Sequence, residues 1–421
     1  MKYFESIIPR SSKRTTKKEL YKYYAGFSEE FVEDILEQLK LPKDNIILDP
    51  WNGSGTTTYI ATKLGYTSYG IDINPIMTIL SKARLHSCHH NSMEISKIIK
   101  QAKLYRTRVN EDDLLNKWFD TKTISYFRNI ERSILEGKRI QEYNNDYSKI
   151  DVEKCFYILI LINTIKRFIK TIKSSNPSWI KQVNLLDDEK ISVIRSGIDE
   201  AFNEEFLSTI TIIKNKNTLN KFELCNLLIG KSENINLPSK SINCIITSPP
   251  YCTRIDYAVL TNLELALAGI SEDEFNNLRH QLTGGPVIHD TLPEPLTNWG
   301  QLCLNTLHEI KNHHSRASES YYYKTYLQYF DSMYKSFVEM NRVLMNNSYC
   351  IIVVQNSFYK DIYIDLSKIF EEFSLNFKWK LVKTYQFDAS KNLTKTNKGS
   401  AKYKKNKVIK EYTLIFYKGD H

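Results

Sequence analysis

The chain has 421 residues, of which 42% are hydrophobic and 25% charged, a composition typical of a globular protein with a large core. Its longest apolar run, residues 156–162, is too short to cross a bilayer. The first residues also lack the apolar segment of a signal peptide. We therefore expect no membrane association and a cytoplasmic location.

The cysteine and histidine pattern argues against a disulfide or zinc framework. The seven cysteines are scattered and include no C-x-x-C pair. The nearest approach to a metal cluster is HSCHH, which holds His86, Cys88, His89 and His90. No second group of ligands accompanies it, so we expect no metal site.

The net charge of +10 is unevenly distributed. Residues 391–410 contain eight lysines and no acidic residue, and a second basic stretch covers residues 10–18. Lysine and arginine displace counterions from phosphates, so a polyanionic partner would explain both stretches. A solvated lysine-rich loop explains the first stretch equally well.

Strand-like runs recur along the chain, and helical patterns separate most of them, which indicates a parallel α/β sheet. In chain order the runs cover residues 45–49, 67–73, 225–230, 241–247, 349–355, 380–387 and 411–417. Only the lysine-rich stretch joins the last two, so they are predicted to form an antiparallel hairpin. Two long interruptions remain, a mostly helical one at 91–220 and a turn-rich one at 258–320.

The first strand runs into DPWNGSGTT, and the second ends in GIDINP. Gly53 and Gly55 permit a tight turn, and Thr56 begins a helix whose free amides and positive dipole end suit a carboxylate or phosphate. Asp72 lies 19 residues after Gly53 at a strand end, where an acid can hold ribose hydroxyls. A helix cap before Asn74 is the alternative role of Asp72.

The fourth strand ends in TSPPY, residues 247–251. Ligands of open α/β sheets bind outside the carboxyl ends of the strands, where the strand order reverses. The first and fourth strands flank that point. We therefore expect DPWNGSG and TSPPY to face each other across one crevice.

Both motifs resemble those of the DNA amino-methyltransferases. DPWNGSGTT is similar to their cofactor motif, DPFxGSGT, and TSPPY to their catalytic motif, in the form characteristic of enzymes that methylate the N4 amine of cytosine. The resemblance implies a class I S-adenosylmethionine-dependent methyltransferase fold: a Rossmann-like seven-stranded α/β sheet with a terminal antiparallel hairpin and a large helical insertion. Residues 1–90 and 221–421 would form the catalytic domain, and residues 91–220 a mostly helical insertion. Target recognition would lie in that insertion, in residues 258–320, or in both, and the size of the insertion favours it.

The resemblance also implies a binding site for S-adenosyl-L-methionine. Relatives carry an acid after the third strand where this chain has Lys231, so Ser232 or Glu233 would substitute. Tyr24 and Phe27 resemble the segment that covers the methionine end of the cofactor, although both could be core aromatics. The residues assigned to the cofactor are Asp49, Pro50, Trp51, Gly53, Ser54, Gly55, Thr56, Asp72, Ile73, Tyr24, Phe27 and Ser232.

The catalytic assignment is Ser248, Pro249, Pro250 and Tyr251. The Ser248 hydroxyl and the Pro249 carbonyl would accept hydrogen bonds from an exocyclic amine, while both prolines hold the turn rigid. Tyr251 would stack on the base after it leaves the helix.

The DNA-contact assignment is Arg254 together with three lysines of the acid-free stretch. Arg254 immediately follows the catalytic motif, and a local pairing with Asp256 is the alternative for its side chain. The three lysines are Lys402, Lys404 and Lys405.

These assignments predict a site-specific methyltransferase acting on cytosine N4 in double-stranded DNA. The resemblance implies that it protects host DNA from a cognate restriction endonuclease. Adenine-N6 methylation on the same scaffold is the nearest alternative. A tRNA guanine-N2 methyltransferase and an inactive DNA-binding subunit are the others.

Overall fold

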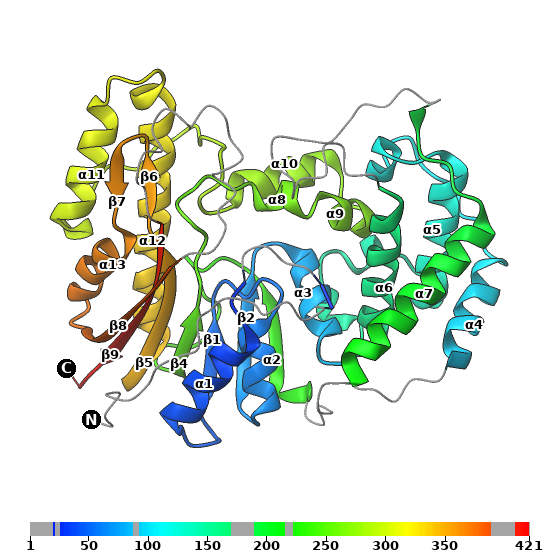
Figure 1. The fold of residues 1–421 in the computed structure, drawn as a ribbon, viewed down its shortest axis with the longest axis horizontal. Helices are drawn as coiled ribbons and strands as arrows, with labels where there is room; N and C mark the ends of the chain where they lie inside the picture. Colours follow the sequence, from blue (N-terminus) through cyan, green and yellow to red (C-terminus); the bar gives the residue numbers. More distant parts are fainter. Residues whose placement is uncertain are drawn as a thin grey trace.

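A seven-stranded sheet forms the centre of the molecule (Figure 1). The computed structural model describes residues 20–21, 26–86, 92–169, 189–214, 222–388 and 409–420. The strands are β1 (Ile46–Asp49), β2 (Thr67–Asp72), β3 (Cys225–Ile229), β4 (Ile242–Thr247), β5 (Leu344–Gln355), β8 (Lys380–Asp388) and β9 (Lys410–Lys418).

The strand order is β3-β2-β1-β4-β5-β9-β8. Strands β1 to β5 are parallel, and β9 runs antiparallel between β5 and β8. The seven predicted strands and the terminal hairpin are therefore present. The order reverses between β1 and β4, because the chain moves outward through β2 and β3 and then returns to the other side of β1.

Helices cover both faces of the sheet, and side chains alternate between them along each strand. Ile47 and Ile246 pack on one face with α1 and α2, whereas Leu48 and Ile245 pack on the other with α11, α12 and α13. The Ser28 hydroxyl caps α1 by accepting a hydrogen bond from the Phe31 amide. The helices are α1 (Glu29–Leu39), α2 (Thr56–Lys63), α11 (Gln301–Asn312), α12 (Lys324–Val343) and α13 (Leu366–Leu375).

A separate helical lobe lies to the right of the sheet in Figure 1. At its centre is α6, whose residues 155–162 are all buried, so it is apolar around its whole circumference. Residues of α9 and α10 belong to the same hydrophobic cluster. The lobe therefore includes the start of the second interruption, residues 258–320. The sequence-based domain boundary at residue 221 had placed that segment in the catalytic domain. Its helices are α3 (Pro75–Ala83), α4 (Ser92–Ala102), α5 (Thr121–Ile134), α6 (Val152–Phe168), α7 (Arg195–Lys214), α8 (Tyr257–Leu260), α9 (Asn262–Ala268) and α10 (Glu272–Gln281).

Two short strands form a hairpin outside the main sheet, β6 (Ser357–Tyr359) and β7 (Ile362–Ile364). A π-helical turn, Ser318–Tyr323, leads into α12. Among the described helices, none combines the length and the apolar character that a bilayer crossing requires.

A buried arginine fastens α5 to α9. The Arg128 guanidinium is only 1% exposed, and it bonds Asp113 at 2.8 and 2.9 Å and Glu131 at 2.9 Å. It also donates to the carbonyls of Ala266 at 2.9 Å and Leu267 at 2.5 Å. These carbonyls lie in the last turn of α9, where the regular intrahelical donors end, although the Ala266 carbonyl also accepts from the capping Gly269 amide at 3.1 Å. The ion cluster therefore joins the two interruptions into one lobe.

We expect Arg128→Met to lower the free energy of unfolding by about 3–5 kcal/mol, because it leaves two buried carboxylates with only the longer contacts to Arg139, at 3.5 and 3.8 Å. Urea unfolding of the whole chain measures the change. Arg108→Met, which replaces an exposed arginine, is the matched control. Equal effects of the two substitutions would contradict a clamping role for Arg128.

Candidate active site

The two sequence motifs begin at neighbouring strand ends that are hydrogen-bonded to each other. The Thr247 hydroxyl, at the end of β4, donates to the Asp49 carboxylate, at the end of β1, at 2.6 Å. The Trp51 amide donates to the same carboxylate oxygen at 3.1 Å. Burial raises the pKa of Asp49 to about 6. This junction lies where the strand order reverses, which is where ligands of open α/β sheets bind.

The glycine turn after β1 is held by contacts within the protein. The Gly53 amide donates to Asp72 at 2.8 Å, and the Gly55 amide donates to the Asn52 carbonyl at 2.8 Å. Gly55 has φ 78°, and a Cβ there would come within 2.8 Å of the Ser81 Cβ, so only glycine fits. Internal acceptors therefore already engage the amides of both Gly53 and Gly55.

Asp72 braces the turn and also lines the pocket. Its second carboxylate oxygen accepts a hydrogen bond from the Asn74 amide at 2.9 Å. The cap of α3 is Asn74 itself, whose side chain accepts from the Ile76 amide at 3.3 Å. Burial raises the pKa of Asp72 to about 6. The alternative of Asp72 as the helix cap is thus wrong, and its carboxylate remains beside the cavity.

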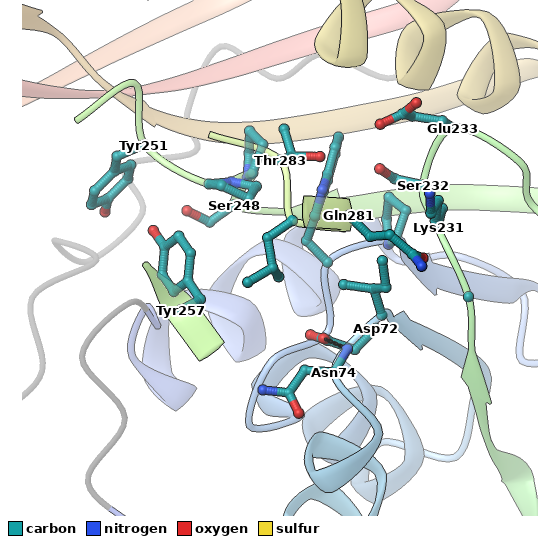
Figure 2. A pocket seen from close by; sticks show the side chains of 17 residues that line it. Asp72, Asn74, Lys231, Ser232, Glu233, Ser248, Tyr251, Tyr257, Gln281 and Thr283 are labelled. Carbon is teal, nitrogen blue, oxygen red and sulfur yellow. Dashed lines mark hydrogen bonds between the residues drawn. The ribbon is translucent and has the colours of Figure 1, made fainter. Parts of the chain in front are cut away.

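One pocket opens beyond the ends of β1, β2, β3 and β4. Figure 2 shows Tyr251 and Tyr257 at one end, Lys231 and Ser232 at the other, and Ser248 between them. Pro50 and Trp51 of the first motif and Ser248 to Tyr251 of the second share this cavity, whereas residues 53–56 do not line it. Its full lining is Pro50, Trp51, Asp72, Ile73, Asn74, Gly230, Lys231, Ser232, Glu233, Ser248, Pro249, Pro250, Tyr251, Tyr257, Gln281, Leu282 and Thr283.

A tyrosine that the sequence did not reveal holds the turn of Ser248 to Tyr251, here called the catalytic turn after its predicted role. The Tyr329 hydroxyl, on α12, donates to the Pro250 carbonyl at 3.0 Å. Burial raises the pKa of Tyr329 well above its ordinary value, so the hydroxyl stays a donor. A Cβ on Gly284 would lie 3.3 Å from both the Tyr251 carbonyl and the Tyr329 ring, so this loop packs closely on the same turn. Tyr329 therefore positions the turn from outside the motif.

The residues after the catalytic turn are braced by an ion pair. Asp256 caps α8 by accepting from the Val259 amide at 3.1 Å, and its other oxygen bonds Arg279 of α10 at 2.8 Å. The alternative of an Arg254–Asp256 pair is therefore wrong. Arg254 instead lies over the Tyr322 ring, 4.3 Å from its centroid.

Hydroxyl groups of α12 organise the far end of the pocket. Ser232 is buried and shares a hydrogen bond of 2.9 Å with Ser336. Glu233 accepts a hydrogen bond from Ser332, which also shares one of 2.8 Å with Thr283. Ser232 and Glu233, the substitutes expected for an acid at position 231, thus both lie at the cavity, and Lys231 is exposed.

Other predicted residues lie away from the cavity. Ser54 and Thr56 are buried beside Arg84, which bonds the Ser54 carbonyl at 3.2 Å and Glu29 at 2.6 Å. Phe27 packs on Phe31 in the hydrophobic core on one face of the sheet. Its side chain therefore matches the alternative role of a core aromatic.

Seven predicted residues lie outside the described residues. They are Tyr24, Lys402, Lys404 and Lys405, together with Cys88, His89 and His90 of the HSCHH cluster. The fourth member, His86, stacks on the Phe156 ring with the ring centroids 4.3 Å apart. No cluster of metal-ligating side chains occurs among the described residues.

The sheet order and the pocket at the carboxyl ends of its parallel strands together define a class I methyltransferase fold, as predicted. A family model described as DNA methylase matches residues 2–82. Together with the relatives below, this match shows that the chain is similar to DNA methylases.

Three relatives are type II methyltransferases. M.BsoBI of Geobacillus stearothermophilus is 29% identical over 291 residues, which cover 61% of this chain and 54% of that protein. M.AvaI of Nostoc sp. (strain PCC 7120) is 26% identical over 403 residues, covering 85% and 78%. M.MvaI of Kocuria varians is 22% identical over 375 residues, covering 83% and 79%. The chain thus matches about half the length of M.BsoBI.

A solved structure, the rRNA methyltransferase aviRa from Streptomyces viridochromogenes, aligns with a TM-score of 0.28 and 10% identity over 93% of this chain and 86% of that one. This likeness is too weak to carry an argument. The fold assignment follows from the strand order.

The raised pKa of Asp49 predicts a pH dependence of stability. Because the folded-state pKa of about 6 exceeds the ordinary 3.8, the folded protein holds a proton that the unfolded chain releases between these values. This contribution to stability is complete below about pH 4 and is lost as the pH rises through about 6.

Relative to Asp49→Asn, the wild-type free energy of unfolding should therefore fall by about 1.4 kcal/mol per pH unit from about pH 4 to 6. Above about pH 6.5 the difference should be constant. Urea titrations across this range measure it, with the exposed Asp44→Asn as a control for loss of one negative charge. A difference independent of pH would show that Asp49 is ionised throughout.

Proposed function

We propose that the protein transfers a methyl group from S-adenosyl-L-methionine to the N4 amine of cytosine in duplex DNA. The observation that carries the proposal is the shared pocket: Trp51 and Asp72 line one part of it, and Ser248 to Tyr251 line another. A donor and an acceptor bound in the same cavity can react in line, because binding removes their translational freedom.

The residues present fit the cofactor. Asp72 offers a carboxylate, beside the end of β2, for the ribose hydroxyls, while Trp51 and Ile73 offer apolar surface for the adenine. Ser232 and Glu233 would accept from or donate to its polar edge. When bound, S-adenosyl-L-methionine supplies an activated methyl group on its sulfonium.

The catalytic end fits a base held outside the helix. Tyr251 and Tyr257 present two rings beside Ser248 (Figure 2), and stacking on one ring typically contributes about 1–3 kcal/mol per base. The Ser248 hydroxyl and the Pro249 carbonyl would accept the two amine hydrogens and so direct the nitrogen lone pair at the methyl group. Since Tyr329 fixes the adjacent Pro250 carbonyl, these acceptors are preorganised.

We propose cytosine rather than adenine as the target base because of the residue that precedes the two prolines. Ser248 has the form that resembles the cytosine-N4 enzymes, whereas adenine-N6 relatives more often carry Asp or Asn there. The helical lobe would read the target sequence, because α8 and α10 connect it directly to the pocket (Figure 1). By analogy with restriction–modification systems, the methylation would protect host DNA from a cognate endonuclease.

The identity of the product tests this function. Plasmid DNA and tRNA are incubated separately with the protein and methyl-labelled cofactor. The plasmid should yield N4-methylcytosine as the labelled nucleoside in mass spectrometry. Labelled N6-methyladenine would instead show that the target base is adenine. Label found only in tRNA, or in no nucleic acid, would contradict DNA methylation and favour an RNA enzyme or an inactive DNA-binding subunit.

We expect Ser248→Ala to slow methyl transfer by about 100-fold, as removal of a preorganised polar contact to the reacting group typically does. The dissociation constant of the cofactor should not change, because Ser248 would contact the base. Single-turnover rates and calorimetry measure the two quantities. The control is Ser241→Ala, a serine at the opposite end of the same strand whose hydroxyl bonds the Pro238 carbonyl. Wild-type turnover in Ser248→Ala would remove the serine from the mechanism.

A further inference from the structure

Arg254 is held in an uncommon backbone conformation three residues after the catalytic turn. Its φ is 57°, in the left-handed region that non-glycine residues rarely occupy. Such strain persists where the surrounding structure enforces it, and it concentrates at functional sites. The fold therefore directs this side chain to a particular place.

The Arg254 guanidinium has no acidic partner among the described residues. It lies 4.3 Å from the Tyr322 ring centroid and 5.9 Å from that of Tyr321, while its Nε is buried and makes no hydrogen bond in the described part of the chain. The nearby Asp256 is engaged by Arg279. A guanidinium stacked on a ring keeps its in-plane N–H donors available for an anion.

The surroundings favour an anion. The Lys360 ammonium is also close to the Tyr322 ring, 5.8 Å from its centroid. Two neighbouring carboxylates are already paired, Asp361 with His313 at 2.8 Å and Glu319 with Lys311 at 3.8 Å. Arg254 and Lys360 thus bring two cationic groups to one ring, and cationic groups attract an anion.

We propose that Arg254, stacked on Tyr322, binds a backbone phosphate of the DNA strand that carries the extruded base. The proposal rests on the DNA methylation proposed above. Three residues span at most about 11 Å of chain, so Arg254 lies within reach of the sugar–phosphate of a base held by Tyr251. Arg254 does not line the pocket itself, unlike Asp72 and Ser232.

The contact is tested by the salt dependence of DNA binding. In Arg254→Met, the slope of log K against log salt concentration should be less steep by about 0.9, the contribution of one phosphate contact to duplex binding. Affinity should fall roughly tenfold, as expected for a lost charge-assisted hydrogen bond. Arg254→Lys should restore the slope, because it keeps the charge.

The matched control is Lys311→Met. Lys311 also lies over a tyrosine of the same turn, 5.4 Å from the Tyr323 centroid, but Glu319 already neutralises it. Lys311→Met should leave the slope of log K against log salt concentration unchanged. Equal slopes in Arg254→Met and wild type, or equal losses in Arg254→Met and Lys311→Met, would overturn the proposal.

Neutral methylphosphonates then locate the phosphate. Once plasmid methylation has mapped the target site, duplexes are made with one neutral linkage at each position around the target base. Wild type should lose about tenfold in affinity at one linkage beside that base, and Arg254→Met should lose nothing further there. A uniform response at all positions would overturn the proposal.

Two further measurements separate the possible failures. Unfolding midpoints and cofactor dissociation constants of the variants should match wild type, and a weaker cofactor affinity in Arg254→Met would assign the arginine to the cofactor carboxylate instead. If wild-type protein methylates no DNA, the proposed function and the phosphate contact both fail. If it methylates DNA while the slope is unchanged, only the phosphate contact fails.

Discussion

The hydrogen bond from Thr247 to Asp49 joins the ends of β1 and β4, and the site is built around that junction. The bond is short, at 2.6 Å, and buried, so it fixes the two strand ends relative to each other. Each strand end then continues into its own motif, Pro50 and Trp51 on one side and Ser248 to Tyr251 on the other. The distance between the two parts of the pocket is therefore set by the sheet rather than by loop conformation.

Packing from α12 gives the pocket its rigidity at both ends. Tyr329 holds the Pro250 carbonyl of the catalytic turn, and one helical turn further on Ser332 holds Glu233. Ser336 follows after another turn and bonds Ser232. These positions are three and four residues apart, so they lie on the same face of the helix. A single helix thus aligns the end that would hold the base with the end that would hold the cofactor.

Much of the sheet could be predicted because its central strands are largely buried. Residues 242–247 are mostly apolar, as expected for a central parallel strand, and five of the six are buried. β5 begins at Leu344 rather than 349, because its first turn-like residues, including Asn346 and Asn347, hide the start of the strand. The β6–β7 hairpin was not predicted, because three residues are too few to show a period.

The sequence located the parts of the site that follow directly from strand ends. Asp72, Ser248 and Tyr251 all lie at the pocket, because a motif that ends a parallel strand must emerge at the same edge of the sheet. Residues that reach the pocket through tertiary packing gave no such signal. Tyr329 is 79 positions away from Pro250, and nothing in the helical pattern of α12 distinguishes its hydroxyl from those of neighbouring tyrosines.

The lining of the pocket by Gln281, Leu282 and Thr283 has a consequence for how the two lobes act together. Gln281 ends α10, which belongs to the helical lobe, and the other two residues follow it directly. Arg279 ties the same helix to Asp256 just after the catalytic turn. Thr283 is hydrogen-bonded to Ser332, which in turn donates a hydrogen bond to Glu233 at the far end of the cavity. A displacement of α10 would therefore move contacts at both ends of the pocket at once. If the helical lobe reads the DNA, this helix is the physical connection by which a bound target sequence would act on the cofactor and the base together.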